Sequence, residues 1–187
     1  MMNMSVKLNV GDSAPDFSVE DISSEKIVLS EVLKSKDYAV LLFHRYAGCG
    51  FCQMHIAKLM KYADKIREKA EILMFFLSSK DVLLDFARGE NFPFKIISDP
   101  KKEIYKLYGV GTAKNIFGFL NPNVIKHTFE FLMNIDKYKF VKNGLKGDKA
   151  QLHGCFVVTK DMKVKYSHVG KDIAESCKPE EILKNVT

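Results

Sequence analysis

The chain has 187 residues, of which 47% are hydrophobic and 28% are charged, and its formal net charge is +6. This length suits one domain over residues 1–187, and the composition excludes a disordered or fibrous protein. The longest uninterrupted apolar run, residues 72–77, is far shorter than the roughly 20 residues that a membrane-spanning helix needs. We therefore expect no membrane association.

Three features of the sequence indicate the location of the protein, its partners and the role of its cysteines. The amino terminus, Met1–Asp12, carries no signal-peptide pattern, so we expect a cytoplasmic protein. The basic residues are scattered among 23 acidic ones and form no stripe, so nucleic acid is not an expected partner. The chain also has four cysteines, which in a cytoplasmic protein favour catalytic or metal-binding thiols over structural disulfides.

The first half of the chain predicts a strand, a helix and a second strand. Residues 38–43 form a short apolar run typical of a strand that is covered on both faces. From Gln53 to Ile66, apolar residues recur at three- and four-residue spacing, which predicts one amphipathic helix. Residues 72–77 predict a second buried strand. A crossover helix between two such strands makes them parallel neighbours.

The middle of the chain is divided by turn and cap signals. The serines at 78–79 predict the cap of a short helix that stops at Gly89. Residues 94–97 predict another short strand. The Asp-Pro pair at 99–100 predicts the cap and first turn of a further helix, which ends at Gly109.

The second half predicts an inserted helix, a hairpin and a last helix. An Asn-Pro pair opens the inserted helix, over about 122–134, and a lysine-rich segment follows it. Residues 155–159 and 164–168 predict two strands joined by a tight turn, and Pro179 begins the last helix. The fold class is therefore α/β, a thioredoxin-like fold with a central mixed β-sheet flanked by helices, built from a βαβ unit and a C-terminal ββα unit.

Cys49 and Cys52 lie where the first predicted strand gives way to the helix. Unpaired backbone N–H groups at a helix start stabilise a thiolate. In a Cys-x-x-Cys pair at such a position the cysteine pKa is roughly 3.5 to 7.5, against ~8.5 for free cysteine. We expect Cys49 to be the nucleophile and Cys52 its disulfide partner. Arg45, four residues earlier, is a candidate catalytic donor to a bound peroxide or thiolate, and the alternative is a surface arginine.

The same motif allows a metal site. Cys-x-x-Cys is half of many structural zinc sites, but Cys155 and Cys177 are not spaced as a second pair. A copper-binding role, with His153 or His168 beside the two thiols, is a further alternative. The redox interpretation needs neither a metal nor any other cofactor, and we expect none.

The residues at the start of the predicted hairpin are candidates to surround the two thiols. In a thioredoxin-type fold this segment approaches the active-site helix, which selects His153, Gly154 and Cys155. Cys155 also fits a small buried hydrophobe within a strand. Cys177 is interpreted as incidental. The remaining histidines carry too little context to be assigned a role: His44, His55, His127 and His168.

Several motifs resemble one known family over nearly the whole chain. Residues 11–17, Gly-Asp-Ser-Ala-Pro-Asp-Phe, and residues 97–109 resemble the opening and the middle signature of the alkyl hydroperoxide reductase/thiol-specific antioxidant (AhpC/TSA) family. Residues 48–52 and 151–170 are similar to its peroxiredoxin-like subgroup with Cys-x-x-Cys. The resemblance implies a thioredoxin fold and reduction of a hydroperoxide or disulfide. It also implies re-reduction by a thioredoxin-like protein or a low-molecular thiol, and it allows for a homodimer.

Four positions depart from that family's pattern. Leu42 and Tyr46 stand where ordinary peroxiredoxins carry the proline and threonine of Pro-x-x-x-Thr-x-x-Cys, and Tyr46 is therefore placed among the residues around Cys49. His153 matches an arginine of the wider family, and Gly154 matches the cis-proline of thioredoxins. These changes leave the thiol chemistry in place and the substrate open.

The sequence thus predicts a thiol peroxidase that works through a Cys49 sulfenic acid and a Cys49–Cys52 disulfide. One alternative is a thiol-disulfide oxidoreductase acting on protein or glutathione disulfides. Another is a metal-binding or non-catalytic interaction protein.

Overall fold

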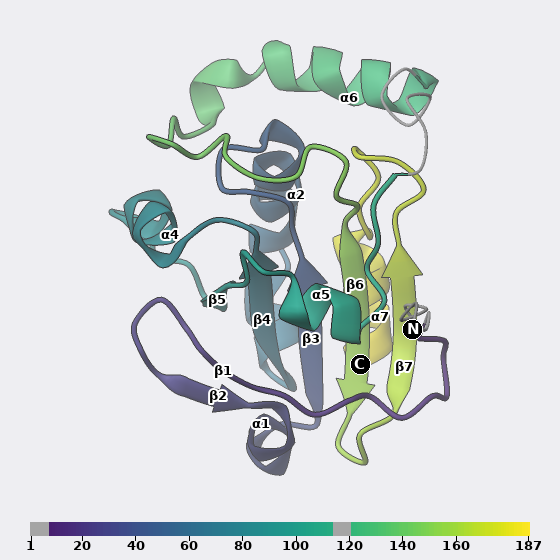
Figure 1. The fold of residues 1–187 in the computed structure, drawn as a ribbon. Helices are drawn as coiled ribbons and strands as arrows, with labels where there is room; N and C mark the ends of the chain where they lie inside the picture. Colours follow the sequence, from purple (N-terminus) through teal and green to yellow (C-terminus); the bar gives the residue numbers. More distant parts are fainter. Residues whose placement is uncertain (1–7, 114–120) are drawn as a thin grey trace, which may run out of the picture.

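The computed structural model describes residues 8–113 and 121–187. A five-stranded sheet with the order β5-β4-β3-β6-β7 forms its centre (Figure 1). β3 and β5 are parallel to β4, and β6 is antiparallel to both β3 and β7. This arrangement confirms the predicted α/β class with its βαβ and ββα units. The strands are β3 (Tyr38–Phe43), β4 (Ala70–Phe76), β5 (Lys95–Ser98), β6 (Gly154–Thr159) and β7 (Val164–Val169).

The central strands are buried on both faces, as their continuous apolar runs predict. On β3, Val40 and Leu42 face one hydrophobic layer, and Leu41 and Phe43 face the other. β4 and β6 follow the same alternation, because successive side chains of a strand point to opposite faces. The core therefore consists of two layers with the sheet between them.

Helices supply the outer walls of both layers. One face is covered by α2 (Gly50–Met60), α3 (Ala63–Arg67), α4 (Lys80–Ala87) and α7 (Pro179–Val186). The other face is covered by α1 (Leu29–Ser35) and α5 (Glu103–Leu107), and a small hairpin of β1 (Ser18–Glu20) and β2 (Lys26–Val28) lies beside them. β1, β2 and α1 were not predicted. The two strands have three residues each, too few to show an alternating pattern, and α1 has seven residues and no capping side chain.

Two predicted helices differ from the structure. The single helix expected from Gln53 to Ile66 is divided into α2 and α3 at Lys61 and Tyr62, whose N–H groups donate to carbonyls two to three residues back. The turn still brings Ile66 into the core. The helix expected from Pro100 begins only at Glu103, because a left-handed residue intervenes. The Asp99 carboxylate caps it from a distance, accepting the N–H groups of Glu103 and Ile104 at 2.8 Å each.

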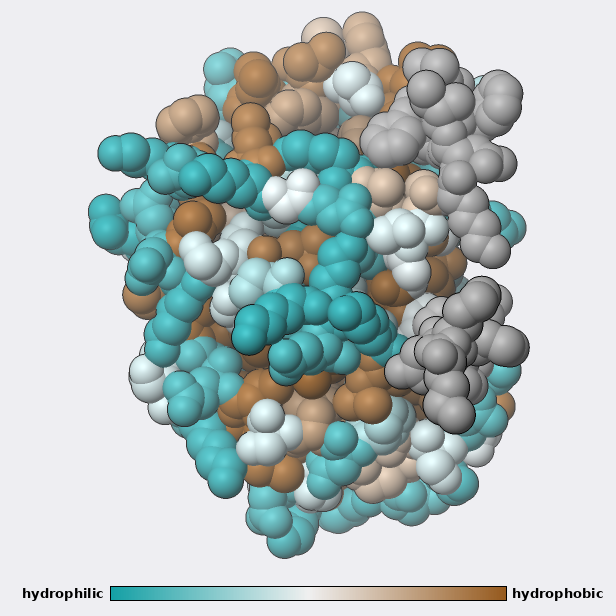
Figure 2. Space-filling view, viewed as in Figure 1, coloured by the Kyte–Doolittle hydropathy of each residue, from teal (hydrophilic) through white to brown (hydrophobic). Residues whose placement is uncertain are grey.

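α6 (Pro122–Leu132) confirms the inserted helix, and the 3₁₀ helix η2 (Ile135–Lys137) follows it. Asn121 caps α6 by accepting the N–H of Val124 at 3.0 Å. The helix lies across the end of the sheet, above α2 (Figure 1). Its other side is exposed and apolar, and Figure 2 shows hydrophobic side chains gathered over α6 at the top of the view. The exposed apolar residues of this region include Ile125, Phe129, Leu132 and Met133.

Within the described ranges, no helix has the length and apolar character required to cross a membrane. The first seven residues, which belong to the segment expected to lack an export signal, lie outside those ranges.

Candidate active site

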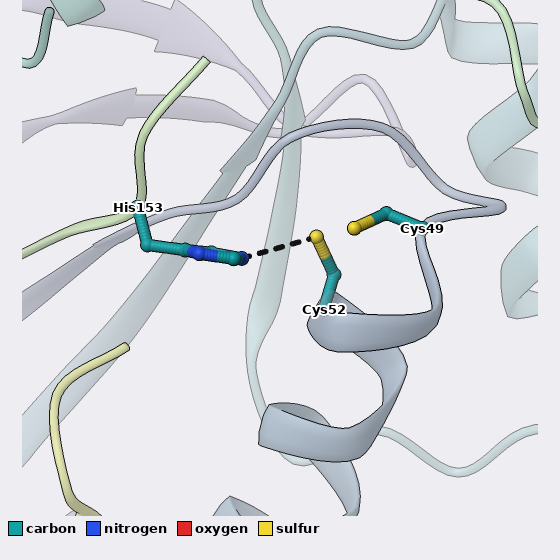
Figure 3. A group of neighbouring side chains, drawn as sticks. All are labelled: Cys49, Cys52 and His153. Carbon is teal, nitrogen blue, oxygen red and sulfur yellow. Dashed lines mark hydrogen bonds between the residues drawn. The ribbon is translucent and has the colours of Figure 1, made fainter. Parts of the chain in front are cut away.

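The two motif cysteines lie at the carboxyl end of β3. The chain leaves β3 after Phe43 and turns into α2, with Cys49 as the N-cap residue. The Cys49 N–H donates to the Tyr46 carbonyl at 2.9 Å, which closes the turn before the helix. Cys52 follows one helical turn later. Figure 3 shows both sulfur atoms at the same end of α2, side by side.

His153 and Arg45 complete the group around the thiols. His153 directly precedes β6 and points its ring at Cys52, with its Nε2 atom 3.2 Å from Cys52 Sγ (Figure 3). The backbone N–H of Arg45 donates to Cys52 Sγ at 3.4 Å, and its Nη1 donates to Cys49 Sγ at 3.5 Å. The predicted residues Cys49, Cys52, Arg45 and His153 therefore meet at one place.

The environment of Cys49 favours its thiolate. Burial raises the pKa of this thiol, since its side chain is only 2% exposed. A hydrogen bond from Cys52, the Arg45 charge and the N–H groups at the start of α2 outweigh burial and lower the pKa to about 7. The expected acidification of Cys49 thus has three identifiable sources.

The environment of Cys52 instead favours the protonated thiol. Burial and the neighbouring Cys49 thiolate raise its pKa well above the ordinary value, so Cys52 keeps its proton. Burial and the positive charge of neighbouring groups hold the pKa of His153 well below its usual range, so the ring beside Cys52 is neutral. One thiolate and one thiol therefore lie side by side in a buried site.

Arg45 is a buried arginine and not a surface one. Its residue is 3% exposed, and its Nη2 donates to the Lys149 carbonyl. Tyr46 lies beside it, with the Lys149 ammonium 3.9 Å from the centre of the phenol ring. The guanidinium is thus held by a backbone carbonyl 104 residues away while one of its N–H groups stays on Cys49.

A cleft of about 400 Å³ lies over Cys49. Its walls come from the start of α2, from α6 and from the segment after α6. Most of the lining side chains are apolar or aromatic, among them Phe51, Phe131, Ile135, Tyr138, Phe140, Val141 and Leu145. The polar residues that line the cleft are Arg45, Tyr46, Cys49, Gln53, Thr128 and Lys139. This shape suits an apolar molecule with one reactive polar end.

Cys49, Cys52 and His153 offer the strongest candidate metal group. Their three ligand atoms lie within 4.8 Å of one another, and no fourth histidine, cysteine or carboxylate within the described ranges joins them. Structural zinc takes four protein ligands. Two thiols and an imidazole suit a soft ion such as Cu(I) better. Cys155, Cys177 and His168 do not belong to this group.

The other two residues predicted around the thiols face elsewhere. Gly154 packs against Val110 and Phe43, on the opposite face of the sheet from His153 and Cys155. Burial and the neighbouring Cys177, not the motif cysteines, raise the pKa of Cys155.

Sequence reasoning missed four contributors to the site region. Lys149 holds Arg45, and Gln53 ties the start of α2 to Lys139 by two hydrogen bonds. His44 and His55 form a buried pair, with 3.0 Å between Nε2 and Nδ1. The only sequence signal for these two histidines was their position next to β3 and on the core side of α2.

Sheet topology and thiol geometry together define a thiol redox protein with a thioredoxin-like fold. The chain matches the AhpC/TSA family over residues 10–167 and belongs to that family. Peroxiredoxin Bcp of Escherichia coli K12 is 24% identical over 130 residues, which are 69% of this chain and 81% of that protein. These relationships support a thiol peroxidase activity.

Solved structures agree on the fold. Peroxidoxin BcpB of Mycobacterium tuberculosis superposes with a TM-score of 0.67 at 17% identity, covering 96% of each chain. A peroxiredoxin-like protein of Aquifex aeolicus gives 0.65 at 17% identity, covering 98% of this chain and 88% of the other. AhpC of M. tuberculosis gives 0.63 at 17% identity, covering 97% of this chain and 92% of the other. The predicted thioredoxin-like fold is therefore confirmed.

Proposed function

We propose that the protein reduces hydroperoxides, with Cys49 as the peroxidatic cysteine, Cys52 as the resolving cysteine and Arg45 as the donor that orients the peroxide. The observation that carries this proposal is the pairing of a thiolate of pKa about 7 with a protonated thiol, both beside a buried guanidinium. A nucleophile with a pKa near the working pH combines ionisation with reactivity.

The first step consumes the peroxide. The Cys49 thiolate attacks the terminal oxygen, the O–O bond breaks, and the alkoxide takes a proton and leaves as an alcohol. Arg45 Nη1, which donates to Cys49 Sγ in the reduced protein, is placed to donate to the peroxide oxygens during attack. Cys49 is left as a sulfenic acid.

The second step forms the disulfide. Cys52 sulfur attacks the Cys49 sulfenic sulfur, and the Cys52 proton leaves with the hydroxyl group as water. His153 Nε2, 3.2 Å from Cys52 Sγ, is positioned to accept that proton in transit. A thioredoxin-like protein or a low-molecular thiol then supplies two electrons and regenerates both thiols.

The cleft supports an organic hydroperoxide as substrate. Its apolar walls would bury an alkyl or aryl group, while the hydroperoxide end reaches Cys49 and Arg45. Hydrogen peroxide has no group to occupy these walls. We therefore propose a preference for apolar hydroperoxides over hydrogen peroxide.

The test is a single-turnover experiment with cumene hydroperoxide and hydrogen peroxide on the reduced protein, Cys49→Ser and Cys52→Ser. We expect fast oxidation of the parent to a Cys49–Cys52 disulfide, no consumption by Cys49→Ser, and one equivalent consumed by Cys52→Ser, which stops at a sulfenic acid. Peptide mapping identifies the products. Multiple turnovers by Cys52→Ser would show that another thiol resolves Cys49. Slow peroxide consumption with fast disulfide reduction would favour the oxidoreductase alternative.

A further inference from the structure

A second pair of cysteines lies on the sheet face that carries α2, away from the cleft over Cys49. Cys155 is on β6 and Cys177 lies two residues before the start of α7. Both belong to the hydrophobic layer formed with α2 and α3. Chain folding thus brings together two thiols that are 22 positions apart and that have no role in the peroxidase steps.

The two thiols and a histidine lie in one buried group. Cys155 and Cys177 are buried in the same hydrophobic cluster, and each thiol shifts the pKa of the other. The Nε2 atom of His55 lies 3.7 Å from Cys177 Sγ, and its Nδ1 atom lies 3.0 Å from Nε2 of His44. His55 therefore has one nitrogen on the sulfur and the other fixed by a buried neighbour, which sets the ring orientation.

Cys177 borders a cavity of about 710 Å³ that is separate from the first cleft. The residue is 4% exposed and lines this cavity together with His55, Tyr166 and His168. Among residues 8–113 and 121–187, none lines both the cavity and the cleft over Cys49. Cys155 is fully buried and does not line the cavity. A molecule that enters the cavity therefore meets Cys177 first.

The cavity walls carry charges of both signs. Three lysines and three glutamates line it: Lys58, Lys61, Lys178, Glu175, Glu180 and Glu181. Such walls suit a small zwitterionic molecule better than an apolar one. This cavity thus differs in chemistry from the apolar cleft over Cys49.

We propose that Cys177 and Cys155 form a second dithiol site, which reduces small polar disulfides with Cys177 as the attacking thiol, Cys155 as the resolving thiol and His55 as the base. His55 takes the Cys177 proton, and the Cys177 thiolate attacks one sulfur of the disulfide. The S–S bond of the substrate breaks, a mixed disulfide forms on Cys177, and the departing thiolate takes the proton back from His55. Cys155 then attacks Cys177, and the second thiol leaves with the proton from Cys155. Two protein thiols are oxidised and one disulfide becomes two thiols.

Two observations agree with this division of roles. Burial raises the pKa of Cys177, but the hydrogen bond from Cys155 and the neighbouring His55 and His168 lower it to about 5. Burial and the neighbouring Cys177 raise the pKa of Cys155 well above its ordinary value. A metal is less suitable here, because Cys155, Cys177 and His55 do not converge as Cys49, Cys52 and His153 do within the described residues.

The test uses a Cys49→Ser/Cys52→Ser variant, which keeps only the second pair. The folded variant is incubated with glutathione disulfide, and the remaining thiols are counted after denaturation. We expect both thiols to be lost, two glutathione molecules to be released per chain, and mapping to find a Cys155–Cys177 linked peptide. Retention of both thiols would overturn the proposal, as would a stable glutathione adduct without the linked peptide.

Three matched variants in the same background assign the roles. Cys155→Ser should trap a glutathione adduct on Cys177, and Cys177→Ser should not react. His55→Gln should react at least fivefold more slowly, while thermal melting shows it folded. An adduct on Cys155 in the Cys177→Ser variant would reverse the assigned order. Mapping of the parent protein after the same treatment tests the linkage even if a serine variant fails to fold.

Discussion

Arg45 is the residue whose charge most directly affects Cys49, and its removal should change the ionisation of the thiol. Cys49 alkylation by iodoacetamide should rise with pH around a midpoint near 7, because only the thiolate reacts. In Arg45→Met the midpoint should move upward. Burial still raises the pKa of Cys49, but the positive charge that stabilised the thiolate is gone. Rates from pH 5.5 to 9, measured by peptide mapping, check this, and an unmoved midpoint would contradict it.

Phe140 tests the proposed substrate preference. Its side chain lines the cleft but is 87% exposed, so its replacement disturbs little of the core. In Phe140→Ser the kcat/KM for cumene hydroperoxide should fall about threefold to tenfold, the equivalent of roughly 1 kcal/mol of apolar contact. The value for hydrogen peroxide should not change.

Phe129→Ser is the matched control for this measurement. Phe129 is 66% exposed on α6 and does not line the cleft. Phe129→Ser should leave kcat/KM unchanged for both peroxides. Equal losses for the two peroxides in Phe140→Ser would show that the cleft does not bind the organic group.

Prediction at the residue scale succeeded where chemistry depends on short spacing. Cys49, Cys52 and Arg45 lie within eight positions of one another, so a strand followed by a helix is enough to bring them together. His153 required knowledge of which strand comes to lie beside β3. Lys149, His55 and Cys177 could not be predicted, because their contacts depend on packing between segments far apart in the chain. The interpretation of Cys177 as incidental stays a prediction, since its contact with His55 left no signal in the sequence.

At the scale of elements, the junction of α2 and α6 depends on a glycine. Gly50 is the first residue of α2, and a Cβ atom there would lie 2.6 Å from the Phe131 ring of α6. Gly50→Ala should gain about 1 kcal/mol of helix propensity and lose about 1–3 kcal/mol from the collision. We expect a net loss of up to about 2 kcal/mol of unfolding free energy, measured in urea.

The double variant Gly50→Ala/Phe131→Leu separates the collision from other effects of the alanine. Phe131→Leu removes the ring atoms that Gly50→Ala would meet. In that background Gly50→Ala should become neutral or stabilising. A Gly50→Ala protein more stable than its parent would show that α6 moves aside without cost.

Apolar runs, helical spacing and cap residues predicted the longer helices and strands. Tertiary contacts determine where these elements begin and end. The strands β3, β4, β6 and β7 and the helices α4, α6 and α7 were found close to their observed bounds. The division between α2 and α3 carries no proline or glycine and so left no signal in the sequence. The late start of α5 depends on the backbone angle of Lys102, which residue type does not indicate.

For the whole molecule, buried neutral histidines predict a loss of stability in mild acid. Burial lowers the pKa of His44 and of His153 well below the ordinary value of 6.5. At these two histidines the unfolded chain therefore binds more protons than the folded one below about pH 6.5, so their contribution to stability is complete above that pH and falls as pH decreases. Each histidine costs up to about 1.4 kcal/mol per pH unit in this range.

Urea unfolding at pH 7.5 and pH 5.5 measures this effect. We expect the two histidines to contribute about 2 kcal/mol to the loss of stability at pH 5.5, and the loss to be smaller in His44→Phe. The thiols with lowered pKa values, Cys49 and Cys177, change stability in the same direction. The carboxyl groups with lowered pKa values, such as Asp148 and Asp172, contribute only at lower pH, because unfolded carboxyls titrate near pH ~4. Equal stabilities at the two pH values would contradict the prediction. A single transition in these curves would also agree with one domain over residues 1–187, which stays a prediction.

The position of Cys49 at the start of α2 has a further consequence for energetics. The N–H groups and the guanidinium stabilise an anion that exists only while the sulfur is reduced, and a disulfide carries no charge for them to stabilise. In the proposed cycle, oxidation therefore removes this stabilisation, which favours the reduced form of the pair. The feature that favours attack on the substrate thus also makes the proposed disulfide easier to reduce.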